Sequence, residues 1–210
     1  MFRNLLNPEG GLMITMGQIT DVIFLSLFWL VLCIPVVTAG PATAALYDAV
    51  VHSFRRGEPK AWSRFFRSFR MNLRTGIPAT ILWAAAIALL GRGMIGLWNG
   101  TVAGHVAWPV FSGTALLALV VFGVLSVMFP LLSRFETGVG RLAVNTVLIA
   151  LGNMPRTLAL AALNAAAVYA CMRWVWPVFI LPCLAALVGS LFIEPMLRPY
   201  MPAEEMQKTE

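Results

Sequence analysis

The sequence is poor in charged residues, because only 11% of its 210 residues are Asp, Glu, Lys or Arg. An ordinary soluble domain carries about 25%, so this chain has too little charge to cover a surface in water. Hydrophobic residues make up 60% of it, and the mean hydropathy is +0.82. The composition therefore argues against a soluble globular domain and predicts an integral membrane protein.

Cysteine and histidine are also scarce. Cys33, Cys171 and Cys183 all lie in apolar runs, without a second Cys or a His at the spacing of a metal site. We interpret them as small packing residues. His52 and His105 lie in different predicted loops, with no nucleophile beside them. The sequence predicts no catalytic site, no cofactor and no metal, so we expect a protein that is not an enzyme.

A cleavable signal peptide is lacking as well. The first 18 residues are mixed and polar, and the apolar run that follows continues without an A-x-A-like cleavage site. We therefore expect the first apolar segment to be retained as a membrane anchor.

Apolar runs that approach the roughly 20 residues of a spanning helix recur along the chain. The predicted fold class is all-α, a polytopic transmembrane helical bundle that forms one membrane domain over residues 1–202, with a polar tail at 203–210. Three interfacial helices are predicted at 41–57, 59–75 and 142–154. The last is too short to span, which leaves an interfacial or a re-entrant helix. The five predicted spans are 19–38, 77–97, 108–132, 157–172 and 174–196.

Positive charge is unevenly distributed among the predicted loops. The loop 40–76 contains seven cations and the loop 133–156 contains three, whereas the alternate loops hold little beyond Arg92 and Arg173. Because cytoplasmic loops carry the excess of Lys and Arg, we expect the N-terminus outside and the C-terminus in the cytoplasm. A sixth span would place the C-terminus outside the cell instead. The same rule explains the net charge of +6 without a nucleic-acid partner.

The most distinctive predicted element is the helix at 59–75. At 100° per residue, aromatic side chains fall on one face and basic side chains on the other. Such a helix lies in the headgroup plane of a bilayer with its cations toward anionic lipid headgroups. The alternative is a cytoplasmic docking element for a partner protein. The residues that form the two faces are Lys60, Trp62, Arg64, Phe65, Phe66, Arg67, Phe69, Arg70 and Arg74.

Two polar residues within the predicted spans are candidates for a functional contact. Asp21 lies near the end of the first span, where pairing with a cation or helix capping is the simpler role. Asn164 lies near the middle of the fourth span, where an interhelical hydrogen bond is the simpler role and a substrate contact the alternative. A transporter would need a polar cavity lined by Asn164, Thr80 or Ser126.

Several short segments occur in a characteristic order: Leu6–Pro8, Asp21–Ile23, Leu27–Leu30, Ile34–Gly40, Thr43–Tyr47, Phe65–Asn72, Phe129–Phe135 and Asn153–Thr157. Together they resemble the YesL family of bacterial integral membrane proteins, a family defined as a domain of unknown function. The resemblance covers most of the chain up to the fourth predicted span. It implies a multi-pass protein of the bacterial cell membrane, of a kind often found alongside carbohydrate uptake and degradation systems in Gram-positive bacteria. It supplies no catalytic residues.

Two functions follow as expectations. The first is an accessory or scaffold component that associates with a carbohydrate uptake system, with subunits of a carbohydrate ABC transporter as partners. The absence of charged residues in mid-span favours it over the second, which is a transporter or permease component for a small solute.

Overall fold

The computed structural model describes residues 11–55, 61–135, 138–174, 176–197 and 199. Within these ranges the regular structure is helical and contains no strand, so the predicted all-α helical bundle is confirmed. Lys60 and the polar tail 203–210 lie outside the described residues. The helices are α1 (Gly11–Cys33), η2 (Val36–Thr38), α2 (Ala39–Val50), η3 (Val51–Arg55), α3 (Ala61–Val102), α4 (Trp108–Arg134), α5 (Val139–Gly152), α6 (Met154–Arg173), η4 (Trp176–Phe179) and α7 (Leu181–Leu197).

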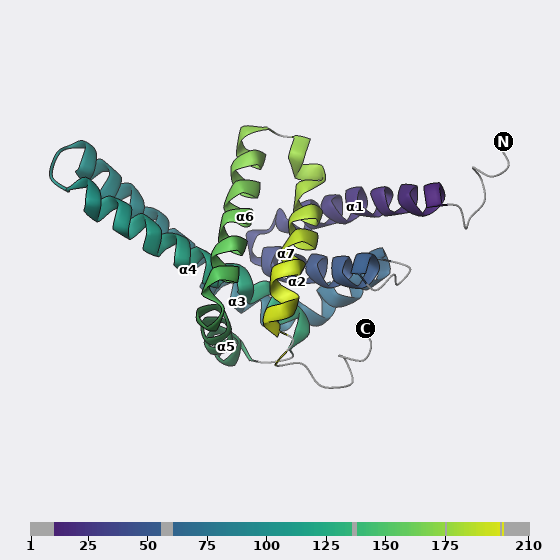
Figure 1. The fold of residues 1–210 in the computed structure, drawn as a ribbon. Helices are drawn as coiled ribbons and strands as arrows, with labels where there is room; N and C mark the ends of the chain where they lie inside the picture. Colours follow the sequence, from purple (N-terminus) through teal and green to yellow (C-terminus); the bar gives the residue numbers. More distant parts are fainter. Residues whose placement is uncertain (1–10, 56–60, 136–137, 175, 198, 200–210) are drawn as a thin grey trace.

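Helix α2 forms the centre of the packed body (Figure 1). Ten of its 12 residues are buried, and it packs against α1, α3, α4 and α7. Its alanines let the neighbouring helices approach closely. The helix predicted at 41–57 as interfacial therefore lies inside the protein. Its α-helical part ends at Val50, and the π-helical turn η3 follows directly. Amphipathicity could not predict this, because neighbouring helices cover both faces.

The crossing of α2 and α3 depends on two glycines. A Cβ atom at Gly40 would lie 2.1 Å from Thr80 Oγ1, and one at Gly76 would lie 2.5 Å from Pro41 Cγ. The Gly40 amide donates a hydrogen bond to Thr80 Oγ1 at 3.1 Å. The Thr80 hydroxyl in turn donates to the Gly76 carbonyl at 2.7 Å. These glycines allow two backbones to meet without intervening side chains.

Helix α3 is one helix of 42 residues, where the sequence predicts an interfacial helix at 59–75 followed by a separate span at 77–97. The predicted break at Gly76 does not occur, because that glycine serves the close approach to α2 rather than ending the helix. Pro78 lies inside the helix. Proline is tolerated within such helices when neighbouring helices and hydroxyl groups satisfy the freed backbone.

The far part of α3 and the first part of α4 form a helical hairpin, residues 81–122, that projects from the body (Figure 1). Within 81–100 every residue is at least partly exposed, although the segment is strongly apolar, and Trp83 at its start packs on the core. Its turn uses Gly104, whose φ of 76° suits glycine. Trp98 contacts Trp108 and Phe111 at the tip. An exposed apolar surface that extends along a helical hairpin is typical of contact with lipid or protein.

Helices α3 and α4 are each long and apolar enough to cross a membrane. In the described part of the chain, α3 and α4 are the two single helices that meet this criterion, and a third span results if α5 and α6 count together as one broken span. Helices α5 and α6 meet at an angle of 106°, so the stretch predicted at 142–154 forms the separate helix α5. The apolar segment Thr20–Cys33 and α7 are shorter. The five-span count therefore stays a prediction.

Candidate functional site: a basic cleft

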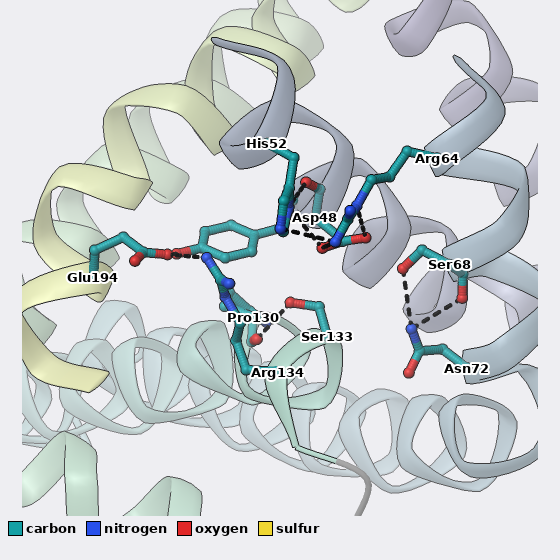
Figure 2. Close-up of polar contacts among 10 residues, drawn as sticks. Asp48, His52, Arg64, Ser68, Asn72, Pro130, Ser133, Arg134 and Glu194 are labelled. Carbon is teal, nitrogen blue, oxygen red and sulfur yellow. Dashed lines mark hydrogen bonds and ion pairs between the residues drawn. The ribbon is translucent and has the colours of Figure 1, made fainter. Parts of the chain in front are cut away.

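One polar cluster lies where α2 gives way to the π-helical turn. Asp48 is in the last turn of α2, His52 is in η3, and Arg64 comes from the first turn of α3 (Figure 2). Arg64 Nε donates to Asp48 Oδ2 at 3.0 Å and Arg64 Nη2 approaches His52 Nε2 at 2.8 Å. Because a guanidinium has only donors, His52 Nε2 must accept, and His52 Nδ1 donates to the Asp48 carbonyl at 2.9 Å. The three side chains are locked to one another.

Burial of the Asp48 carboxyl disfavours its charged form, but hydrogen bonds from His52 and Arg64 outweigh that cost. The pKa of Asp48 is therefore lowered from its usual value. Asp48 is ionised at neutral pH, and its charge is matched by that of Arg64. Such π-helical turns occur frequently at functional sites.

A second cluster joins α2, α4 and α7. Arg134, in the last turn of α4, donates from Nη2 to Glu194 Oε1 at 2.5 Å. The Tyr47 hydroxyl donates to the same oxygen at 3.2 Å. The side chain of Arg134 is only 4% exposed and that of Glu194 14%, so this is a buried ion pair. It fixes the ends of α4 and α7 to the centre of the body.

Between the first half of α3 and the end of α4 lies an open cleft of about 880 Å³. Figure 2 shows several of its polar side chains, including Arg64, Ser68 and Asn72 on one side and Ser133 and Arg134 on the other. Asn72 Nδ2 donates to the Ser68 carbonyl and hydroxyl. The lining residues are Asp48, Ser63, Arg64, Arg67, Ser68, Met71, Asn72, Arg74, Thr75, Leu132, Ser133, Arg134, Phe135 and Gly138.

The structure divides the predicted basic face of 59–75. Arg64, Arg67 and Arg74 line the cleft, whereas Arg70 is exposed and is not among the lining residues. We call these four arginines the basic face of α3. Arg67 and Arg74 are exposed, and they form no ion pair with another described residue.

The aromatic face of the same segment packs on protein. Phe65 is completely buried, and its ring lies 6.4 Å from that of Phe28 on α1. Phe66 lies 5.0 Å from Phe28, and Phe69 packs on the same cluster. Only Trp62 of the predicted aromatic set is largely exposed, at 57%. The sequence assigns this face to the membrane surface, whereas the structure places Phe65 in the core, because α1 supplies an aromatic partner from a distant part of the chain.

A second, mostly apolar cavity of about 310 Å³ lies among α2, α3, α4, α6 and α7. Thr80, Ser126 and Asn164, the three polar residues expected to line the cavity of a transporter, all line it. Trp83 also lines it, and Trp83 Nε1 is buried without a hydrogen-bond partner among the described residues. Asp21 lies on α1, half-buried, and is not among the lining residues of either cavity.

The sequence missed the two clusters that shape the cleft. Asp48 and His52 stand four residues apart in an otherwise apolar helix, which is a usable signal, because ionisable groups in such a setting need partners. Glu194 lies near the end of the last predicted span, 174–196, where an acidic side chain is expected to pair with a cation or to cap a helix. That Arg134 is the partner, 60 residues away in the chain, is visible only in the fold.

Residues 22–93 match the model of a family described as a protein of unknown function, DUF624. The match runs from α1 through α2 into the projecting part of α3, so it includes Asp48, His52 and the basic face of α3. No curated protein and no solved structure matches the chain.

Proposed function

We propose that this chain is a multi-pass protein of the bacterial cell membrane, of the YesL family, and serves as an accessory or scaffold component of a carbohydrate uptake system rather than as an enzyme. The match to DUF624 over residues 22–93 coincides with several of the segments that resemble YesL. The resemblance suggests subunits of a carbohydrate ABC transporter as partners.

The observation that carries the proposal is the way in which the first half of α3 is held. Its aromatic face is fixed to α1 through Phe65 and Phe66, so the segment is not free to insert those rings into lipid. Trp62 and Arg70 remain exposed on a helix that is anchored on its other side. Rigid presentation of an aromatic and an arginine side chain suits a protein interface, where these residue types dominate binding.

The arrangement of the helix ends supports a cytoplasmic position for this face. The start of α3, the end of α4 and the end of α7 all meet near the two polar clusters (Figure 2). The predicted topology assigns the start of α3 and the end of α4 to the cytoplasm because the loops 40–76 and 133–156 are rich in arginine, and it assigns the C-terminus to the same side because the predicted spans number five.

Crosslinking with mass spectrometry in native membranes tests the proposal. The double variant Trp62→Ala/Arg70→Glu should lose its crosslinks to the transporter subunits while the wild-type chain keeps them. Arg141→Ala is the matched control, because Arg141 is an exposed arginine on α5 and is not among the lining residues of the cleft. Recovery of the wild-type chain without any crosslinked partner would overturn the accessory function.

A second candidate, a permease component for a small solute, is favoured by the cavity that Thr80, Ser126 and Asn164 line. Trp83 Nε1, which has no hydrogen-bond partner in the part of the chain that the structure describes, offers a donor to a bound solute. Uptake by proteoliposomes of the purified chain tests it. Asn164→Leu should abolish uptake if the cavity carries solute, and proteoliposomes that take up no carbohydrate would leave the accessory function as the better proposal.

A further inference from the structure

We propose that the basic cleft between α3 and α4 binds the phosphate group of an organic phosphate. This site is separate from the proposed docking residues Trp62 and Arg70, which are not among its lining residues. Its volume of about 880 Å³ falls in the range of small-molecule sites, which is about 300–1,000 Å³.

The charge in the cleft is unbalanced. Four arginines line it, against the single carboxylate of Asp48. Asp48 is paired with Arg64, and Arg134 is paired with Glu194 from outside the lining. Arg67 and Arg74 form no ion pair with any other described residue. Since they stand seven residues apart on one face of α3, about two helical turns, the cleft retains two positive charges for a ligand.

Arg134 supplies the most specific signal. Its side chain is 4% exposed, it lines the cleft, and its Nε is buried without a hydrogen-bond partner among the described residues. A buried donor left unpaired costs the full desolvation free energy of that group. An anionic oxygen in the cleft would accept this hydrogen bond while Arg134 Nη2 keeps Glu194. The ion pair with Glu194 holds the guanidinium in position, and a phosphate oxygen in the cleft would supply the acceptor that Arg134 Nε lacks among the described residues.

The other lining groups favour phosphate over a simple anion. Arginine forks bind two phosphate oxygens at once, and the hydroxyl groups of Ser63 and Ser68 offer neutral donors on the wall formed by α3. Met71, Leu132 and Phe135 add apolar surface that an organic substituent would cover. A phosphate ester has enough terminal oxygens to engage both walls together. The same chemistry is available from a lipid headgroup and from a soluble sugar or glycerol phosphate.

Binding to the purified full-length chain in neutral detergent tests this site, at constant ionic strength. The probes are glycerol phosphate, phosphatidylglycerol and, as the neutral lipid, diacylglycerol, and affinity is measured by titration of thermal stability. The double variant Arg67→Ala/Arg74→Ala should lose roughly tenfold or more in affinity. Arg70→Ala, which removes a positive charge from the same helix outside the cleft, should stay within about twofold.

Each outcome decides the proposal. Binding of both phosphate probes with similar affinity supports a soluble organic phosphate as the ligand, and binding of phosphatidylglycerol alone supports a lipid headgroup. Absence of binding by either phosphate probe overturns the site. An equal loss in Arg70→Ala and in the double variant also overturns it, because diffuse surface charge would then account for the binding. Partner crosslinking is read separately through Trp62 and Arg70, so the failure of one proposal is distinguishable from that of the other.

Discussion

The two halves of α3 lie in different surroundings although they form one continuous helix. The first half packs its aromatic face on α1, crosses α2 at Gly76 and lines the cleft with arginines. In the far half every residue between 81 and 100 is at least partly exposed, and Trp83 at its start packs on the core. Within it, a Cβ atom added at Gly91, Gly93 or Gly96 would meet nothing within 4 Å. Tight packing and a polar cleft are thus confined to the body, and the hairpin offers its apolar surface outward.

The contrast shows that apolar composition by itself does not identify a core. In the apolar 18-residue window of α3 only 6% of the residues are buried. In that of α4 the share is 39%, because the second part of α4 returns to the body. The surface of the hairpin therefore needs a partner outside this chain, and lipid is the partner that its length and hydropathy suit.

The largest effect is expected from breaking the buried ion pair of the body. Glu194→Ala leaves Arg134 charged and unpaired in a site where it is 4% exposed. Removing one partner of a buried pair costs about 3–5 kcal/mol, so the free energy of unfolding in detergent should fall by that amount. Arg156→Ala, which removes an exposed contact with Asn153, is the control and should cost less than about 1 kcal/mol. Equal losses would show that the body has no special dependence on this pair.

A smaller but still clear effect is expected at Asp48. Asp48→Asn removes a charged acceptor shared by His52 and Arg64, and hydrogen bonds to charged groups are worth about 1.5–3 kcal/mol. The pKa of Asp48 is lowered in the folded state. Its contribution is therefore fully present above the unfolded value of about 3.9 and is lost as the pH falls through the lower folded value.

Unfolding measured between pH 7 and pH 2 checks this. The wild-type chain should lose stability below about pH 4, and the difference between it and Asp48→Asn should shrink there. A difference that stays constant with pH would mean that the ionised carboxylate contributes nothing.

The glycines of α3 test the comparison directly. Gly76→Ala adds a Cβ that would lie 2.5 Å from Pro41 Cγ, and overpacking of this kind costs about 1–3 kcal/mol. Gly93→Ala makes the same chemical change in the same helix where nothing lies within 4 Å. It should leave stability unchanged or raise it by up to about 1 kcal/mol, since alanine favours the helix. If both variants were destabilised alike, the hairpin would be packed against something absent from this chain.

The sequence predicts the helical class and the apolar segments because hydropathy and helical length are local properties. The same local patterns lead the sequence to place Phe65 at the membrane surface and α2 at the membrane interface. The partners that bury them, Phe28 and the helices around Ala44, come from distant positions. The helical pattern predicts the three arginines that α3 contributes to the cleft as a basic face, but the opposite wall, formed by Ser133 and Arg134, lies some 60 residues further along. A pocket between distant segments has no signature in a local pattern.

The smallest effect is expected at the tip of the hairpin. Trp98→Ala removes ring contacts with Trp108 at 6.1 Å and with Phe111 at 5.5 Å. Aromatic pairs contribute about 0.5–1.5 kcal/mol beyond their buried area. Because the tip lies at the far end of the hairpin that projects from the body (Figure 1), the loss should stay local. Hydrogen exchange should speed up around residues 98–111 and stay unchanged in α2 and at the Asp48 cluster. Faster exchange in the body as well would show that the hairpin and the body unfold as one unit, and the division of α3 into two independent halves would then fail.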